Sequence, residues 1–483
     1  MKTVDTEFCL INPPALLDKP PIEQSGTLFI PERLKIAAIN PGILSIASYL
    51  DSKGYAVRIL DLSGETDWTR VGKLLSKAGA GLYGISSTSA FDYIESLEIA
   101  RLLKSYFPET PVILGGQHAG ALGSGVLRDS PHVDAVVLHE GEWVAEQMLC
   151  SQRKGLFPFS VPGVVFRRNG RVRSAAGEGR RISVNELPFL KYELYPDFRK
   201  FMPYVEESRG CCYRCHYCSS NSINQSRIDP KDPGRFLEEF SECVKLFGRD
   251  RAYAVLASSF GVLPKNGKAI ARGMRRFGIK WNSEFRVDGC WEEYIGDLLS
   301  AGYEVVNVGL ESASPSILRL MNKTRQPEQY LEKMARLAGI VSGSDSVIRA
   351  NLMFYAGESP QTLRETLSFL SSTKGIDSIQ YSPLLLFPGA PVTKEFGTYE
   401  KRFGAKMVDH PYWRRRHLYP IHPSNYFSFE ESVYFCHVTE KIFSDEDAWL
   451  EAAKGLYTQE SDQEIAKTRE TLRVARFRRS GAV

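Results

Sequence analysis

The sequence lacks long apolar runs and a marked charge of either sign. No stretch of about 18 apolar residues occurs, which argues against a transmembrane helix. The opening MKTVDTEFCLINPP has none of the features of a signal peptide. The 61 basic and 57 acidic residues give a net charge of +4, too balanced to indicate a nucleic-acid or membrane-surface partner. We therefore expect a cytoplasmic protein that binds neither nucleic acid nor membrane.

The sequence also lacks a plausible disulfide framework. Its nine cysteines are an odd number, and five of them are widely scattered, which suits a reducing compartment. The other four fall within the eight residues 211–218, and this density calls for a different explanation.

Three of these clustered cysteines have the spacing C-x3-C-x2-C, at Cys211, Cys215 and Cys218. Soft thiolates bind iron–sulfur clusters or zinc. Three ligands on a [4Fe–4S] cluster leave one iron free to bind S-adenosylmethionine (SAM). A structural zinc site, with Cys212 or His216 as the fourth ligand, is the alternative, but no second ligand pair follows along the chain.

Two series of alternating strands and helices predict an α/β protein. In the first 150 residues, helical patterns at 41–54 and 93–107 separate near-continuous apolar runs, which are typical of a doubly wound parallel sheet, Rossmann-like. These runs are 8–12, 57–62, 82–87, 111–116 and 134–139. Six further strand patterns predict a partial (β/α)6 barrel, at about 204–210, 253–260, 280–287, 305–312, 347–356 and 378–387.

The domain boundaries follow from these patterns. We expect a Rossmann-like domain at 1–150, a linker at 151–200, the barrel at 201–395 and a small α-rich region at 396–483. The linker contains a hairpin turning at Asn169-Gly170. The basic run Trp413–His417 is either a contact for an acidic substrate group or, more commonly for such runs, a solvated face.

The cysteine segment SRGCCYRCHYC resembles the cluster loop of the radical SAM superfamily, and the segments at 283–288, 308–323, 355–370 and 385–391 resemble later strand-end motifs of the same barrel. The resemblance implies that Tyr217 packs near the adenine and that Glu311 and Ser312 lie near the ribose. It places the remaining SAM contacts at Arg349, Gly357 and Glu358. Ser258 stands near the position where many relatives carry an aspartate.

The first domain resembles the cobalamin-binding domain that precedes the barrel in one radical SAM class. Small and hydroxyl-bearing residues at strand ends let a large cofactor approach the backbone. The contacts implied are Ser86, Ser87, Thr88, Gly115, Gly116, Gly141 and Glu142. Asp61–Gly64 lacks the D-x-H-x-x-G histidine, which suggests cobalamin bound without a histidine ligand. The alternative is a domain that keeps the fold without the cofactor.

The resemblance implies an enzyme that reductively cleaves SAM at a [4Fe–4S] cluster. The resulting 5′-deoxyadenosyl radical would abstract hydrogen from an unactivated carbon of a small-molecule natural product, and the leading hypothesis is cobalamin-dependent C-methylation. The alternative is dehydration or deoxygenation of an aminoglycoside-type sugar, or a rearrangement, without cobalamin. A third hypothesis is a non-enzymatic metal or cluster protein. A flavodoxin- or ferredoxin-type protein is the expected electron donor, and the sequence identifies no catalytic side chain.

Overall fold

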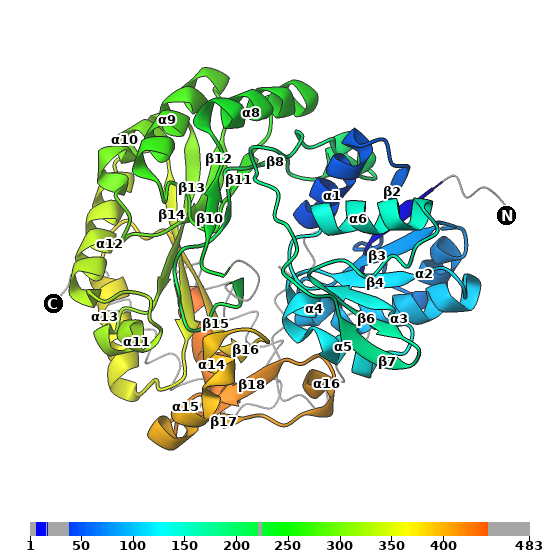
Figure 1. Cartoon of the computed structure of the whole chain (residues 1–483). Coiled ribbons are helices and arrows are strands. Elements are labelled where there is room, and N and C mark those ends of the chain that lie inside the picture. The colour runs from blue at the N-terminus through cyan, green and yellow to red at the C-terminus, as the bar shows by residue number, and fades with distance from the viewer. Residues whose placement is uncertain (1–5, 16, 18–37, 221–224, 443–483) are drawn as a thin grey trace.

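Two sheets, each with helices packed against it, form the frame of the molecule (Figure 1). The computed structural model describes residues 6–15, 17, 38–220 and 225–442. The arginine-rich stretch at 469–479 lies outside these residues. None of the described helices is long and apolar enough to cross a membrane.

The first sheet has the strand order β2-β1-β3-β4-β5-β6-β7, and its first five strands are parallel. These are β1 (Phe8–Asn12), β2 (Val57–Asp61), β3 (Leu82–Ser86), β4 (Val112–Gly115) and β5 (Ala135–Val137). They alternate with α1 (Pro41–Ser52), α2 (Trp68–Leu75), α3 (Ala90–Tyr106), α4 (Gln117–Leu122), α5 (Ser124–Asp129) and α6 (Glu142–Arg153). This arrangement confirms the predicted doubly wound sheet.

Strand β1 shows why both faces of this sheet need helices. All five of its side chains are buried. Phe8 and Leu10 pack in the cluster that contains residues of α1 and α6, whereas Cys9 and Ile11 pack in the cluster that contains residues of α2 and α3. A strand whose successive side chains point to opposite faces, all of them apolar, is stable only between two layers of helices.

The hairpin at 164–174 belongs to the first sheet and not to a free linker. Its strands, β6 (Val164–Arg168) and β7 (Arg171–Ser174), are antiparallel, and β6 pairs with β5. The predicted turn is present, with φ of 51° at Asn169 and 70° at Gly170, the left-handed conformation that a tight hairpin turn requires. The sequence therefore predicted the hairpin itself, but we placed it outside the sheet that it extends.

The second sheet is the predicted partial barrel of six parallel strands, ordered β15-β14-β13-β12-β11-β8. They are β8 (Tyr204–Glu206), β11 (Tyr253–Leu256), β12 (Trp281–Phe285), β13 (Tyr303–Glu311), β14 (Val347–Phe354) and β15 (Ser378–Pro383). The helices cover the outer face (Figure 1): α8 (Pro233–Phe247), α9 (Pro264–Met274), α10 (Ile295–Ser300), α11 (Pro315–Leu320), α12 (Pro327–Val341) and α13 (Pro360–Ser372). Alternate residues of β14 are buried against these helices, so Arg349 faces inward.

The described part of the C-terminal region is not only α-rich. It contains β17 (Lys406–Met407) and β18 (Tyr419–His422), and β18 also pairs with β16 (Leu385–Leu386), which precedes the region, in a small antiparallel sheet. The short helix α14 (Pro391–Lys394) also precedes the region. The helices of the region itself are α15 (Phe396–Phe403), α16 (Pro411–Arg414) and α17 (Phe429–Ile442), and α17 packs on β15.

Only part of the basic run at Trp413–His417 is a solvated face, because Arg414 and Arg415 are exposed but their neighbours pack against the first domain. Trp413 and Arg416 are buried, and the Arg416 guanidinium makes two 2.8 Å bonds to the carboxylate of Glu95 in α3. The His417 ring lies 2.6 Å from Asp129 of α5. This segment therefore fastens the C-terminal region to the first domain.

Candidate cofactor sites

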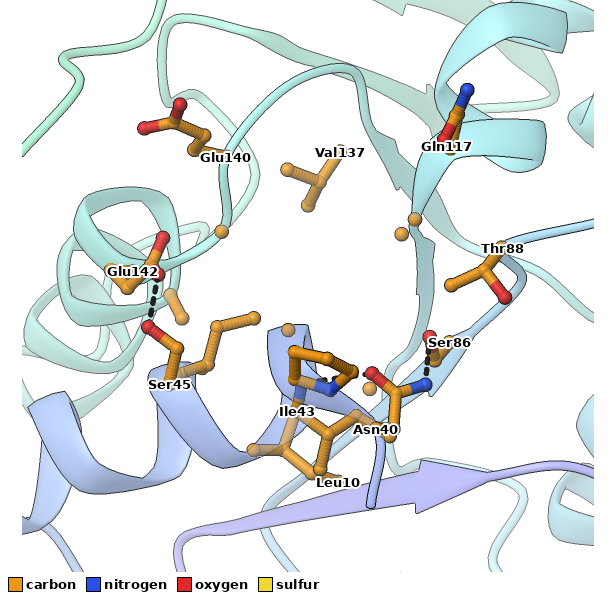
Figure 2. A pocket seen from close by; sticks show the side chains of 18 of the residues that line it. Leu10, Asn40, Ile43, Ser45, Ser86, Thr88, Gln117, Val137, Glu140 and Glu142 are labelled. Carbon is orange, nitrogen blue, oxygen red and sulfur yellow. Dashed lines mark hydrogen bonds between the residues drawn. The ribbon is translucent and has the colours of Figure 1, made fainter. Parts of the chain in front are cut away.

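A cavity of about 390 Å³ lies between the first domain and the barrel. Figure 2 shows its first-domain walls, in which side chains from the carboxyl ends of the strands meet the first turns of α1, α4 and α6. The barrel contributes Tyr204, Glu206, Arg209 and Leu256 to the opposite wall. Its position at the carboxyl edge of a parallel sheet is where such sheets bind ligands.

Glycines keep this cavity open. A Cβ atom at Gly84 would lie 2.7 Å from the Phe8 ring, and one at Gly141 would lie 2.5 Å from Cδ1 of Ile46. Gly116 has a φ of +99°, and a Cβ there would lie 2.6 Å from the carbonyl oxygen of Ser87. All three glycines line the cavity. Side chains at these positions would occupy or distort space that the backbone now leaves to a ligand.

Six of the seven predicted cobalamin contacts line the cavity: Ser86, Thr88, Gly115, Gly116, Gly141 and Glu142. Ser87 is buried beside it, and its hydroxyl donates a 2.9 Å hydrogen bond to Asp92 in the first turn of α3. The Thr88 backbone N–H also donates to Asp92, at 3.1 Å. Burial raises the pKa of Asp92 to about 6, and these hydrogen bonds act in the opposite direction. The side chain of Ser87 therefore shapes the strand-end loop.

Tyr204 is a cavity residue that the sequence analysis missed. It stands on the barrel strand β8 and is 5% exposed. Its hydroxyl has no hydrogen-bond partner among the described residues, although buried polar groups are normally paired. The hydroxyl oxygen is itself fully buried, so Tyr204 contributes its ring and not this donor to the cavity wall. The Tyr204 position in the sequence resembles an ordinary apolar strand residue, so only the packing of the two domains reveals it.

The three predicted cluster ligands lie on one loop that follows β9 (Ser208–Gly210). Cys215 is buried, and Cys211 and Cys218 are partly exposed. The Arg286 guanidinium donates a 3.4 Å bond to Sγ of Cys215 and lies 3.7 Å from the centre of the Tyr213 ring. Arg286 therefore fixes a positive charge beside the buried sulfur atom of the loop.

The zinc alternative gains no support from the structure. Cys212 is exposed. Within the described residues, no three His, Cys, Asp or Glu side chains lie close enough together to hold a single metal ion.

Tyr217 and Glu311, both predicted SAM contacts, meet at the end of β13. The Tyr217 hydroxyl donates a 2.9 Å hydrogen bond to Oε1 of Glu311, and Lys323 donates to the same oxygen at 2.9 Å. The register of β13 against β14 shifts here, and Glu311 has a φ of +65°. A residue other than glycine with this backbone conformation is strained, and such strain is common at functional sites. Lys323 lies in a motif that the sequence analysis quoted, but its role depends on a contact across the fold.

The other predicted SAM residues are more dispersed. Ser312 is buried, with its hydroxyl 3.3 Å from that of Thr366, and Glu358 is buried with its carboxylate accepting from the Thr362 hydroxyl. Ser258 is exposed in the loop after β11. Gly357 has a φ of +94°. Arg349 pairs in register with Asn307, four residues before Glu311, so it lies deeper in the barrel than the strand ends. These assignments remain predictions.

Comparison with known proteins identifies both domains. Residues 34–149 match the family model of the B12 binding domain, and residues 205–370 match that of the Radical SAM superfamily. The chain belongs to the radical SAM superfamily, in the class that carries a B12-binding domain. Radical SAM domains use a [4Fe–4S] cluster and SAM, and B12-binding domains take cobalamin, so this chain is a radical SAM enzyme with these three cofactors.

The similar proteins agree with this assignment. An uncharacterized methyltransferase of Pyrococcus horikoshii is 26% identical over 358 residues, which cover 72% of this chain and 76% of the relative. A cobalamin-dependent radical SAM methyltransferase of Streptomyces tokunonensis is 22% identical, and the match covers 76% of this chain but only 54% of that relative. The structure of the cobalamin-dependent SAM radical enzyme OxsB has the same fold, with a TM-score of 0.70 at 16% identity over 98% of this chain and 72% of that one.

The residues of this radical SAM enzyme fit its cofactors. Apolar and polar side chains both line the cavity, and its glycines leave room for a large ligand to approach the backbone. Three cysteines on one loop supply soft sulfur ligands for the cluster. The segment Asp61–Gly64 contains no histidine, so it offers no imidazole to the cobalt.

Proposed function

We propose that this enzyme is a cobalamin-dependent methyltransferase that acts on a carbon atom of a small natural-product molecule. The observation that carries the proposal is the position of the cavity. It is walled by the carboxyl edge of the first sheet on one side and by residues beside the cysteine loop on the other, including Arg209 and Ser220. A methyl donor and a radical source would therefore act within one enclosed region. Two relatives named as methyltransferases support the same reaction class.

When bound, the cluster supplies the electron that cleaves SAM to methionine and a 5′-deoxyadenosyl radical, and the cobalamin supplies the methyl group. The chain positions these groups and excludes water. Cys211, Cys215 and Cys218 would hold the cluster. Glu311, fixed by Tyr217 and Lys323, would accept hydrogen bonds from the SAM ribose, because its second carboxylate oxygen makes no hydrogen bond to a described residue.

The inner face of the barrel suits a small polar substrate. Glu284, Asn307 and Arg349 stand in one row across β12, β13 and β14. Neither Asn307 nor Arg349 makes a side-chain hydrogen bond or ion pair with a described residue. The Glu284 side chain keeps an accessible surface, yet desolvation by the surrounding protein raises its pKa, a combination typical of a concave site. We infer that the substrate carries an anionic group, which Arg349 would bind in place of the SAM contact that the family resemblance implies.

The decisive experiment measures two products that do not require a known substrate. The anaerobically reconstituted enzyme, produced with cobalamin, is incubated with SAM and a reductant. S-adenosylhomocysteine forms when SAM gives up its methyl group, and 5′-deoxyadenosine forms when SAM is cleaved reductively. We expect near-stoichiometric cobalamin and both products, with Cys215→Ala losing 5′-deoxyadenosine. An enzyme that makes 5′-deoxyadenosine but binds no cobalamin would contradict methyl transfer and favour dehydration or rearrangement.

A further inference from the structure

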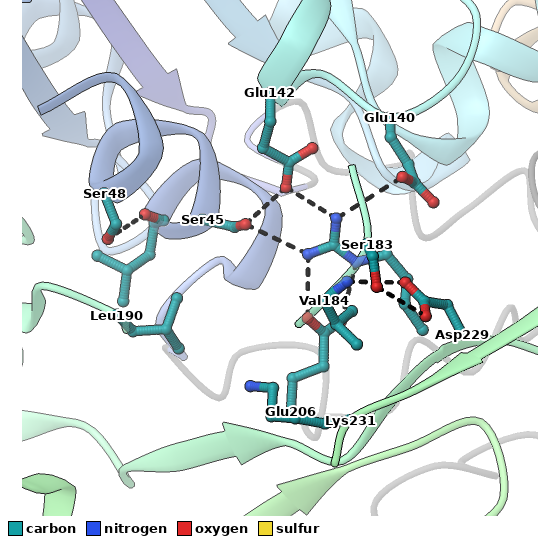
Figure 3. Close-up of polar contacts among 12 residues, drawn as sticks. Ser45, Ser48, Glu140, Glu142, Ser183, Val184, Leu190, Glu206, Asp229 and Lys231 are labelled. Carbon is teal, nitrogen blue, oxygen red and sulfur yellow. Dashed lines mark hydrogen bonds and ion pairs between the residues drawn. The ribbon is translucent and has the colours of Figure 1, made fainter. Parts of the chain in front are cut away.

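The cysteine loop is joined at its N-terminal end to the cobalamin cavity. Arg209, two residues before Cys211, belongs to strand β9. Its Nη1 donates to Oε1 of Glu142 at 2.8 Å, and its Nη2 donates to Oγ of Ser45 at 3.2 Å. Glu142 begins α6, Ser45 lies in α1, and both line the cavity. Figure 3 shows these contacts around the guanidinium, with Glu206 of β8 completing them from the barrel side.

This contact is geometrically specific. The guanidinium also bonds both carboxylate oxygens of Glu206, through Nε at 3.1 Å and Nη2 at 3.0 Å. Ser45 donates in turn to Glu142 at 2.6 Å. The Arg209 and Glu142 side chains are only 17% and 5% exposed. A planar guanidinium with several donors in a fixed fork can connect three partners at once, whereas an ammonium group cannot reproduce this geometry.

The C-terminal end of the loop is joined to the same cavity by a second contact. Ser219 directly follows Cys218, and its hydroxyl accepts a 2.7 Å hydrogen bond from Nε2 of Gln117. Gln117 is the first residue of α4, and it lines the cavity together with Ser220. The three cysteines therefore lie between two attachment points, and each attachment point is bonded to a side chain in the cavity wall.

We propose that Arg209 and Ser219 are positioning residues that couple the cluster site to the cobalamin site. A cofactor in the cavity holds Ser45, Gln117 and Glu142 in place, and these residues hold both ends of the cysteine loop. A cluster on the three thiolates fixes the same loop from the other side. Coupling between two binding sites is reciprocal, so each cofactor strengthens the binding of the other. The inference depends on the two cofactors and not on methyl transfer.

The test compares cobalamin binding with and without the cluster. Hydroxocobalamin is titrated anaerobically into the cluster-free chain and into the reconstituted chain, and the dissociation constants are obtained from the visible spectrum. We expect binding to be at least about fivefold tighter with the cluster, within the range of ordinary coupling. In the reciprocal measurement, hydroxocobalamin should slow the loss of iron to a chelator.

Substituted variants distinguish coupling between the two cofactor sites from the simple loss of a cobalamin contact. Gln117→Ala and Ser219→Ala each remove one hydrogen bond, and their double variant should bring the ratio of the two dissociation constants toward one, with cluster content unchanged. Arg209→Lys keeps the positive charge but not the planar set of guanidinium donors. It should also reduce the ratio of the two dissociation constants. Lys191→Ala is the control, because Lys191 bonds Asp51 of α1 at 2.8 Å, outside the cysteine loop. It should leave the ratio intact.

Three outcomes would overturn the proposal. The first is a wild-type ratio of one. The second is a lowered affinity in the variants with the ratio preserved, which would make Gln117 and Arg209 ordinary cobalamin contacts. The third is an equal loss of the ratio in Lys191→Ala, which would indicate general loosening between the domains.

Discussion

Glu311 joins three parts of the barrel at one carboxylate. Tyr217 comes from the cysteine loop and Lys323 from the turn after α11, and both bond the same oxygen. Glu311→Gln replaces the charged acceptor of Lys323, and of the SAM ribose in our proposal, by a neutral one. Because hydrogen bonds to charged groups contribute about 1.5–3 kcal/mol, we expect the rate of 5′-deoxyadenosine formation at low SAM to fall at least about tenfold.

The control for this prediction lies on the same strand. Glu304, the second residue of β13, accepts an exposed hydrogen bond from Lys280. Glu304→Gln should leave SAM cleavage unchanged. If Glu311→Gln cleaved SAM with an unaltered KM and kcat, the proposed ribose contact would be wrong.

Glu358 predicts a dependence of stability on pH. Burial raises its pKa from 4.5 to about 8, and the hydrogen bond from Thr362 opposes this shift. Between these two values the folded protein holds a proton that the unfolded chain has released. The contribution of Glu358 to the free energy of unfolding should therefore be largest below about pH 4.5. It should fall as the pH rises toward 8, by at most about 1.4 kcal/mol per pH unit.

Glu358→Gln removes this titration while keeping an oxygen that accepts from Thr362. Thermal unfolding of the variant between pH 5 and 8 should show a flatter profile than the wild type, with the variant relatively more stable at pH 8. Parallel profiles for the two proteins would show that Glu358 has an ordinary pKa in the folded state.

At the scale of elements, the cavity depends on how closely β1 and β3 approach one another. A Cβ at Gly84 would meet the Phe8 ring, so Gly84→Ala should push that ring into the cavity or separate the strands. Overpacking of this kind costs about 1–3 kcal/mol, and we expect the dissociation constant for hydroxocobalamin to rise about tenfold. Gly64→Ala is the matched control, since nothing lies within 4 Å of the added atom. Equal affinities in the two variants would show that the cavity does not hold the cofactor.

The strands of the first sheet were predictable because helices cover both of its faces, so these strands carry near-continuous apolar runs. Helices cover only the outer face of the second sheet, and in β14 buried residues alternate with less buried ones. The pairing of β6 with β5 was not predictable, because an Asn-Gly turn specifies a hairpin but not the strand beside which it lies. The same limit applies to the sites. The cysteine spacing is local, and it gave the proposed cluster ligands directly. Arg209 and Glu142 are 67 residues apart, and neither has a local pattern that indicates the other.

At the scale of the whole molecule, the C-terminal region fixes the first domain in place. Arg416 bonds the Glu95 carboxylate and also donates to the backbone carbonyls of Ala90 and Phe91, at the first turn of α3. The Trp413 ring contacts the Phe91 ring edge-on at 6.4 Å. The sequence indicated a charged surface here because the local pattern is basic, but the partner of Arg416 lies 321 residues away along the chain.

This buried ion pair leads to a prediction for the whole molecule. Arg416→Met removes the guanidinium that bonds the buried Glu95 carboxylate, and the loss of one member of a buried ion pair typically costs about 3–5 kcal/mol. We expect hydrogen exchange in 411–418 and in the first turn of α3 to accelerate strongly, because the segment opens locally before the rest of the protein unfolds. Replacing both residues, in Glu95→Leu with Arg416→Met, removes the uncompensated charge and should restore much of the protection. Arg414→Ala, which breaks only an exposed pair with Asp409, should change neither region. If Arg416→Met kept the wild-type exchange rates, the attachment of the C-terminal region would depend on Trp413 and its apolar neighbours. The ion pair would then select this arrangement of the segment without stabilising it.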